Sequence, residues 1–479
     1  MTGRFAGSRT LVLLGALVVA ASAFYAFVVP QTPARLDRAS ADLIHELTLW
    51  REAAALVPVP QSGSAIAVLL TLVAILWLAG FALAVFLTWG REATARRLAV
   101  VLVPAVIACA VSAFALPTAS TDIFDYIAFG RVAAVHDANP YEIPPSAFPD
   151  DPVYPYASPA HRDDPDNKLP AWMLLNRALA EVAGDDVVGN LLVYRFALAA
   201  LNIASLALVV AIASRAFPSA ALAGAVLYGW NPVVVVYGAS KTDTAMVFLF
   251  LLGVVFLARG RPRMAAVPLA LSVFVKLITL PLVVLMWLRE IAARRWRIAA
   301  AQALAFVGVA ALVYAPFGGL DLVSGHIDLF LTGDGSSDAP TAATPALPAI
   351  LRPLLFAVFV AAAYAFLRDE SQARLLRSMA VVALAFGLLL VNPNSSWYLM
   401  TLVAVTAIAG DAWIAAAAAA MTFGAFLFNS WQNASSPAFP LPELMDVPRV
   451  AAYAVPLALL GLAAVVAVIR QARLQRGTV

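Results

Sequence analysis

The sequence predicts an all-α protein, a polytopic bundle of transmembrane helices, and three observations predict this class. Hydrophobic residues make up 63% of the 479 residues and charged residues 12%. Mean hydropathy is +0.88. Apolar runs of about 20 residues, the length that crosses a hydrocarbon core of roughly 30 Å, recur along the chain, and arginine clusters separate many of them. We therefore expect residues 1–479 to form a single transmembrane domain in a lipid bilayer.

The charge and the cysteine content exclude several classes of protein. A formal net charge of +3, spread over loops between apolar runs, offers no basic face for a nucleic acid. The single cysteine, Cys109, lies inside an apolar run, which excludes an intrachain disulfide and a thiolate metal cluster. The sequence carries no signal for a particular oligomeric state.

The first three apolar runs place a long loop outside the cytoplasm. Residues 11–29 follow basic residues and are too long for a signal peptide, so we predict a first span with a cytoplasmic amino end. Residues 30–62 are predicted to include an amphipathic helix on the outer surface. Spans at residues 65–89 and 98–116 then return to the cytoplasm and cross outward again.

The loop at residues 117–186 concentrates polar groups at the mouth of a span. It is dense in Pro, Asp and Tyr, and is therefore too polar to lie in lipid. Asp122 and Asp125 lie near its beginning, followed by Arg131 and by His136, which is most simply a solvated side chain. Carboxylates at a membrane boundary are costly unless they are solvated or used, so this loop is the first place to look for a site.

The positive-inside rule shapes the prediction for the second half of the chain. Residues 264–287 carry Lys276 at their centre, and a single crossing there would leave the arginines at 289–297 outside. We therefore predict two half-length helices that form a re-entrant hairpin with Lys276 near its tip. When this hairpin is not counted as a crossing, both termini are cytoplasmic and residues 317–345 form an outer loop. About 12 spans then cross the membrane. The other predicted spans are residues 187–214, 220–236, 245–257, 298–316, 347–367, 379–391, a short one ending near 410, 412–428 and 450–469.

Several motifs occur in order between Asp122 and Tyr398. The run D-I-F-D-Y-I-A-F-G-R begins at Asp122 and is followed by N-P-Y, which ends at Tyr141. Together with later motifs they resemble the layout of the actinobacterial polyprenol-phosphate-mannose-dependent mannosyltransferases of the GT-C superfamily, an alpha-mannosyltransferase type. The later motifs are W-N-P from Trp230, K-T-D from Lys241, V-K-L-I-T-L-P ending at Pro281 and S-W-Y ending at Tyr398.

The chain departs from these relatives in the outer loop. Ala128-Phe129 replaces the Gln that they commonly have before the Gly. Lys168-Leu-Pro-Ala-Trp stands where they often carry a Tyr-Gly-Pro-Leu-Trp stretch. These departures bear on the choice of donor and acceptor more than on the fold.

The resemblance implies a GT-C-like membrane enzyme, a polyprenyl-phosphate-sugar-dependent glycosyltransferase. It would move a sugar, with mannose expected, from a polyprenyl-phosphate donor to a glycolipid or glycan acceptor on the extracytoplasmic face, with inversion. Residues 117–186 would be its extracytoplasmic catalytic loop. Two alternatives stay open, of which the first would not need Asp122 and the second would share the lipid-phosphate site with a base elsewhere. One is a transporter or flippase of lipid-linked sugars, with Arg195 and Lys276 midway through the membrane, and the other is a polymerase or ligase of surface polysaccharide.

Transfer of a sugar to a hydroxyl needs a base for the acceptor's proton, and the resemblance assigns this role to Asp122. From the residues alone, a cap of a helix that begins near Ile123 is the favoured interpretation. Asp125 lies on nearly the same helical face and is the second catalytic candidate. It would share a proton or a divalent cation with Asp122, or would simply be solvated. A divalent cation is the one candidate cofactor, although further oxygen ligands for it cannot be assigned.

Cations and aromatic residues are the candidate substrate-binding groups. Arg131 is a candidate phosphate ligand, or a side chain that reaches the lipid headgroups. Tyr141 would stack on a sugar, with a simple turn at N-P-Y as the safer interpretation. Lys276 needs an anion at membrane depth, which a lipid phosphate or an Asp of another span would supply.

The remaining candidate binding residues come from the K-T-D and S-W-Y motifs and from one arginine within a predicted span. Lys241 and Asp243 either join the site or pair with each other through solvent. Trp397 and Tyr398 are most simply part of an interfacial aromatic belt, and alternatively walls that stack on a sugar. Arg195, inside its predicted span, is either a phosphate ligand or a structural cation.

Overall fold

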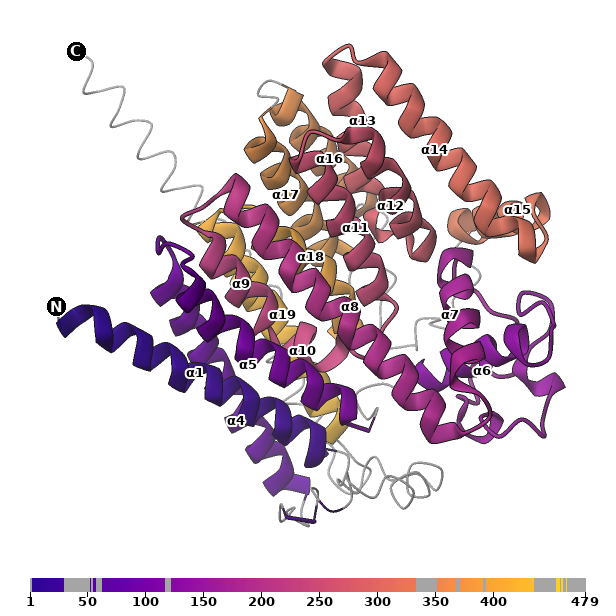
Figure 1. The fold of residues 1–479 in the computed structure, drawn as a ribbon, viewed down its shortest axis with the longest axis horizontal. Coiled ribbons are helices and arrows are strands. Elements are labelled where there is room, and N and C mark those ends of the chain that lie inside the picture. The colour runs from indigo at the N-terminus through magenta and orange to yellow at the C-terminus, as the bar shows by residue number, and fades with distance from the viewer. Residues whose placement is uncertain are drawn as a thin grey trace.

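All regular secondary structure that the structure describes is helical, which confirms the predicted all-α class. Figure 1 shows the long helices packed side by side as a bundle. The predicted surface helix at 30–62 and the predicted last span at 450–469 lie largely outside the described residues. The computed structural model describes residues 2–29, 52, 55–56, 63–116, 122–332, 351–367, 371–390, 393–434, 454–456, 458–459 and 462.

Seven of the described helices are long and apolar enough to cross a membrane, so the chain is a multi-pass membrane protein. Each of them coincides with a span predicted from the sequence. The larger number of about 12 crossings stays a prediction. The seven helices are α1 (Thr2–Phe27), α4 (Gly63–Thr88), α5 (Ala95–Phe114), α8 (Val187–Ala216), α14 (Trp296–Tyr314), α17 (Gln372–Leu390) and α19 (Ala412–Ala434).

The predicted span at residues 220–236 is two short helices. Pro232 has no backbone N–H to donate, and it disfavours helical geometry at the residue before it. That residue, Asn231, accepts a hydrogen bond from the Val233 N–H at 3.0 Å through its side chain and so starts the second helix. The run is therefore helical but broken between Gly229 and Pro232, and its crossing of the membrane stays a prediction. The two helices are α9 (Ala221–Gly229) and α10 (Pro232–Tyr237).

Trp230, between these helices, ties them to the amino-terminal part of the bundle. Its indole N–H donates to the Val101 carbonyl of α5 at 2.9 Å, and its own carbonyl accepts from the Trp77 indole of α4 at 3.0 Å. Both indole rings are fully buried. The W-N-P motif therefore fixes the break in the span against α4 and α5, which lie with α1 at the lower left in Figure 1.

The loop at residues 117–186 contains two helices that pack against each other and against α8. They are α6 (Asp122–Ala134) and α7 (Pro170–Ala183), at the lower right in Figure 1. Gly130 of α6 permits this packing, because a Cβ there would overlap the Tyr194 hydroxyl of α8 and crowd the Asn176 carbonyl of α7. The helix is held in place with Asp122 at its first position.

The apolar run at residues 264–287 is interrupted at Lys276. The helix before it ends at Val275, and Lys276 itself is extended, with φ −164° and ψ 133°. Two short helices with a break near Lys276 are thus present as predicted, whereas their arrangement as a re-entrant hairpin stays a prediction. The elements are α12 (Pro262–Val275), the 3-10 turn η4 (Leu277–Thr279) and α13 (Leu280–Ala292).

The first part of the predicted outer loop at residues 317–345 is helical, and residues 333–345 lie outside the described residues. Gly, Asp and Ser indicated a loop, but apolar residues also recur there at helical spacing. Leu322 from this segment packs into the same small apolar cluster as Tyr141 of the loop at 117–186. The new helix is α15 (Leu320–Thr332). The remaining elements are η2 (Pro145–Ala147), η3 (Tyr154–Tyr156), α11 (Asp243–Ala258), η5 (Ala315–Phe317), α16 (Leu351–Leu367), η6 (Pro393–Leu399) and α18 (Met400–Ala407).

Candidate active site

Six residues singled out from the sequence lie together where several helices begin or end. Two carboxylates occupy the first position of α6 and of α11, and one lysine follows the last residue of α12. Acids at helix amino ends and a cation at a carboxyl end both match the helix dipoles. The six residues are Asp122, Lys241, Asp243, Lys276, Trp397 and Tyr398.

The first ion pair joins Lys241 to Asp122. Lys241 Nζ lies 2.5 Å from Asp122 Oδ2 and 3.4 Å from the centroid of the Trp397 ring. The lysine side chain is fully buried, while 36% of the Asp122 side chain is exposed. The buried ammonium thus has a carboxylate on one side and the face of an indole on another, and both contacts offset part of the cost of burying its charge.

The second ion pair repeats this arrangement. Lys276 Nζ lies 2.9 Å from Asp243 Oδ2 and 3.7 Å from the centroid of the Tyr398 ring. Here the acid is the buried partner, with 1% of its side chain exposed, and the lysine is 24% exposed. Two consecutive aromatic residues of η6 therefore each cover the ammonium group of one lysine.

The observed pairing corrects one of the sequence alternatives. Lys241 bonds Asp122 and Asp243 bonds Lys276, and both Lys241 and Asp243 are buried, so a pair of these two residues through solvent is excluded. The break between α10 and α11 brings Lys241 to Asp122. Gly238 in this segment allows a close approach, since a Cβ there would overlap the Asn202 amide of α8.

Tyr126 belongs to this cluster and was not singled out from the sequence. Its hydroxyl donates to Asp122 Oδ2 at 3.5 Å, and only 5% of the residue is exposed. Tyr126 lies four residues after Asp122, so the helical periodicity of α6 placed both on one face. That spacing is the signal that would have identified it.

Asp125 lies in α6 beside the cluster, but its carboxylate contacts a later part of the outer loop, at Ser158. It is 7% exposed and accepts a hydrogen bond from the Ser158 N–H at 2.7 Å. Burial raises the pKa of Asp125 to about 6. Among the described residues, no three His, Cys, Asp or Glu side chains are grouped so that they could hold a metal ion.

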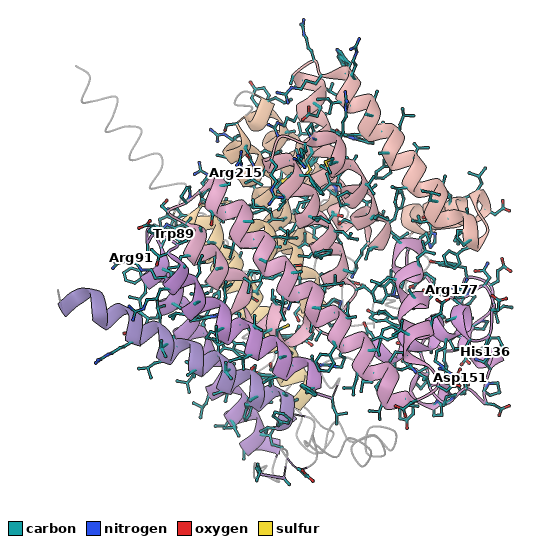
Figure 2. All side chains as sticks on the ribbon, viewed as in Figure 1. Trp89, Arg91, His136, Asp151, Arg177 and Arg215 are labelled. Atoms are coloured by element: carbon teal, nitrogen blue, oxygen red, sulfur yellow. The ribbon has the colours of Figure 1, made fainter. Side chains whose placement is uncertain are left out.

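Arg131 lies in a different network, inside the loop at 117–186. Its Nε bonds both oxygens of Asp151 at 3.0 and 2.9 Å, and its other nitrogens bond Asp185 and the Gly184 carbonyl. His136 Nε2 lies 2.8 Å from the same Asp151 carboxylate, and Figure 2 shows His136 and Asp151 close together at the right of the molecule. The guanidinium therefore ties α6 to Asp151 and to the turn between α7 and α8.

Tyr141 also holds the loop together. Its hydroxyl donates to the Lys168 carbonyl at 2.8 Å, and its ring packs edge to face against Phe317 and His326. These contacts join the N-P-Y turn to η5 and α15. They agree with the turn interpretation of this motif.

Arg195 of α8 binds backbone carbonyls at the end of α5. Its Nε donates to the Ala113 carbonyl at 2.9 Å, and its terminal nitrogen bonds the Ser112 carbonyl. The side chain is 3% exposed. The last carbonyls of a helix lack partners within the helix, so a structural cation suits this position.

The accessible members of the cluster define its chemistry. Solvent reaches one member of each ion pair, Asp122 and Lys276. Their partners, Lys241 and Asp243, are buried. Two acids and two lysines make the group neutral overall, which lessens the cost of burying charge. An accessible carboxylate can take a proton from a hydroxyl, and an accessible ammonium can stabilise a leaving phosphate.

Comparison with known proteins identifies the family. Residues 9–292, more than half of the chain, match the model of the MptA_B family, described as "Alpha-(1->6)-mannopyranosyltransferase, N-terminal domain". The matched segment holds both ion pairs and ends before Trp397 and Tyr398. No curated protein and no solved structure matches the chain. The chain therefore belongs to the MptA/B family of alpha-(1->6)-mannosyltransferases, membrane glycosyltransferases of the actinobacterial polyprenol-phosphate-mannose-dependent GT-C type.

Proposed function

We propose that this enzyme transfers a sugar, with mannose expected, from a polyprenyl-phosphate donor to a hydroxyl of a glycolipid or glycan on the extracytoplasmic face, with inversion. The observation that carries the proposal is the double ion pair under Trp397 and Tyr398. It offers one accessible carboxylate and one accessible ammonium in a single cluster. The reaction needs one group of each kind.

Asp122 is the general base of this proposal. It stands at the amino end of α6, near the start of the outer loop at 117–186. Its side chain is exposed enough to meet an acceptor hydroxyl. The neighbouring Lys241 ammonium favours the ionised carboxylate, which is the form that accepts a proton. Asp122 therefore takes the proton as the acceptor oxygen attacks the anomeric carbon.

Lys276 binds the leaving phosphate. As the new glycosidic bond forms, the bond between the anomeric carbon and the phosphate oxygen breaks, and its electron pair leaves with the phosphate. The Lys276 ammonium, 24% exposed, is placed to bind this dianion. Because one displacement on the opposite face replaces the phosphate, the anomeric configuration inverts.

The remaining candidates support the site from further away. Trp397 and Tyr398 hold the two lysines by cation–π contacts, worth on the order of 1 kcal/mol each. Arg131 and Tyr141 organise the outer loop through the contacts described above, and we assign them this role in place of substrate binding. Asp125 remains the second catalytic candidate, as a residue that shares a proton with Asp122, three residues before it in α6.

The orientation in the membrane is part of the same proposal. Figure 2 places Arg91 and Arg215 at one end of the bundle and the outer loop with His136 at the other, which agrees with the positive-inside rule. The Gln302 amide of α14 bonds the Pro262 carbonyl at the start of α12. Because α14 directly follows α13 in the chain, the start of α12 and the end of α13 both lie near the first half of α14, while Lys276 lies at the site. This arrangement supports the re-entrant hairpin. The proposed total of about 12 crossings depends on that hairpin, because it sets the side of the membrane on which each later loop lies.

Replacement of Asp122 tests the proposal. Asp122→Asn should lower turnover by about 10²- to 10⁴-fold, because the amide cannot take the proton. The assay is transfer from synthetic polyprenyl phosphate mannose to a synthetic alkyl glycoside by the purified protein in detergent. Asp164→Asn, an exposed acid of the same loop, is the matched control and should keep normal turnover. Full transfer by Asp122→Asn would remove Asp122 from the reaction.

A further inference from the structure

Asp243 has a carboxylate oxygen that the two ion pairs do not use. Its Oδ2 accepts a hydrogen bond from Lys276 Nζ at 2.9 Å, whereas its Oδ1 is buried and bonds no group in the part of the chain that the structure describes. Only 1% of the Asp243 side chain is exposed, so water does little to stabilise its charge. A buried carboxylate oxygen without a donor is costly, and a nearby donor that reached it would remove that cost.

Lys241 is a donor within electrostatic reach of this oxygen. It precedes Asp243 by two residues, in the turn before α11, and the Asp243 charge acts on its ammonium group. In the structure Lys241 Nζ bonds Asp122 Oδ2 at 2.5 Å. Lys241 therefore has an accessible and a buried carboxylate close to it, and it bonds the accessible one.

Binding of the donor would change the balance of charge in this group. Without a donor, the two acids Asp122 and Asp243 face two lysines. The phosphodiester of a polyprenyl phosphate sugar brings one more negative charge to Lys276, so three anions then share two ammonium groups. Asp122 can best do without a lysine, because 36% of its side chain is exposed, against 1% for Asp243.

We propose that Asp243 couples donor binding to the release of the base, an inference that rests on the proposed function. When the donor phosphate binds Lys276, the Lys241 ammonium moves its hydrogen bond from Asp122 Oδ2 to Asp243 Oδ1. No proton is transferred and no covalent bond changes in this step. Asp122 is then a stronger base, because the positive charge that stabilised its ionised form has moved away.

The coupling gives the two substrates different roles. An acceptor hydroxyl that arrives before the donor meets a carboxylate held by Lys241, which is a weak base. A hydroxyl that arrives after the donor meets a released carboxylate. Asp243 is therefore a positioning residue, because it acts on the reaction through the two lysines.

Replacement of Asp243 is the first test, since it should move donor binding and turnover in opposite senses. In Asp243→Asn no carboxylate competes with the phosphate for Lys276, so the Kd for farnesyl phosphate mannose should fall about threefold or more. Lys241 then keeps its bond to Asp122, so kcat for transfer to an alkyl glycoside should fall about tenfold or more. Calorimetric titration without acceptor measures the Kd. A higher Kd, or an unchanged kcat, would overturn the proposal.

The control and a rescue exclude simple damage to the protein. Asp164→Asn, an exposed acid of the outer loop, should leave both values at the wild-type level. In the double variant Lys241→Met/Asp243→Asn, no lysine holds Asp122 and Lys276 is free for the phosphate. Its kcat should exceed that of Asp243→Asn by about fivefold or more, an effect that loss of folded protein cannot produce. A double variant slower than Asp243→Asn would refute the coupling.

The donor Kd also separates this proposal from the assignment of the base. Lys241→Met leaves one lysine for Asp243 and the phosphate, so the Kd should rise about tenfold above the wild-type value. The expected order of Kd values, with Asp243→Asn lowest and Lys241→Met highest, needs no sugar transfer. Full transfer by Asp122→Asn would remove Asp122 as the base and leave this order intact. The reverse order would refute the coupling even with Asp122 confirmed as the base.

Discussion

Lys241 and Lys276 show how burial separates two residues of the same type. Both lie near an aromatic face and both bond a carboxylate. Lys241 is fully buried, so its contacts are internal, and its proposed part is to hold Asp122. Lys276 keeps an accessible surface, and an ammonium that water reaches can also be reached by a phosphate.

The raised pKa of Asp125 should make the stability of the folded protein depend on pH. Burial raises its pKa to about 6 in the folded protein, above roughly 3.9 in an unfolded chain. The raised value means that Asp125 contributes stability below pH 4 that is lost as the pH rises through 6. From pH 5 to 7.5, wild type should therefore lose about 1 to 2 kcal/mol more stability than Asp125→Asn.

Thermal unfolding in detergent at the two pH values checks this prediction. The asparagine keeps an oxygen that can accept from the Ser158 N–H, so the local hydrogen bond survives the substitution. Asp164→Asn, which is exposed, should follow the wild type. Parallel pH profiles for wild type and Asp125→Asn would show that Asp125 titrates normally.

At the scale of elements, the site depends on how closely α6 approaches α7 and α8. Gly130→Ala would push a methyl group against the Tyr194 hydroxyl and the Asn176 carbonyl. We expect it to lower stability by about 1 to 3 kcal/mol, the usual cost of overpacking. Transfer activity should fall with it, because α6 carries Asp122.

The control for this change is a glycine with room around it. Gly308→Ala in α14 meets no atom within 4 Å, so it should not destabilise the protein. Thermal unfolding and transfer assays on both variants measure the difference. Equal stability of Gly130→Ala and the wild type would mean that α6 can shift without cost.

At the scale of the whole molecule, the hairpin at Lys276 predicts which side each loop faces. Ala147→Cys in the outer loop and Ala292→Cys at the end of α13 are both exposed positions. An impermeant maleimide should label the first in spheroplasts and the second only after the membrane is opened. The native Cys109 is buried, so the background should be low. Labelling of Ala292→Cys in sealed spheroplasts would show that residues 264–287 cross the membrane once.

Hydropathy, the length of the apolar runs and the order of the motifs predicted the class of the protein and most of its candidate site. Hydropathy and length predicted the seven long spans, because a helix that crosses lipid must be apolar along its whole length. The local pattern of residues predicted the wrong secondary structure where two signals in the same segment disagree. Pro232 breaks a run that hydropathy alone counts as one span, and α15 forms where Gly and Asp indicated a loop.

Which charges meet and which stay accessible follows from the packing of the helices and could not be predicted from local sequence. Lys241 bonds an acid 119 residues away and Lys276 one 33 residues away, although Asp243 lies two residues from Lys241. Partner choice at such separations follows from the packing of whole helices, which the local pattern around each residue does not encode. The same packing placed Trp397 and Tyr398 over the two lysines.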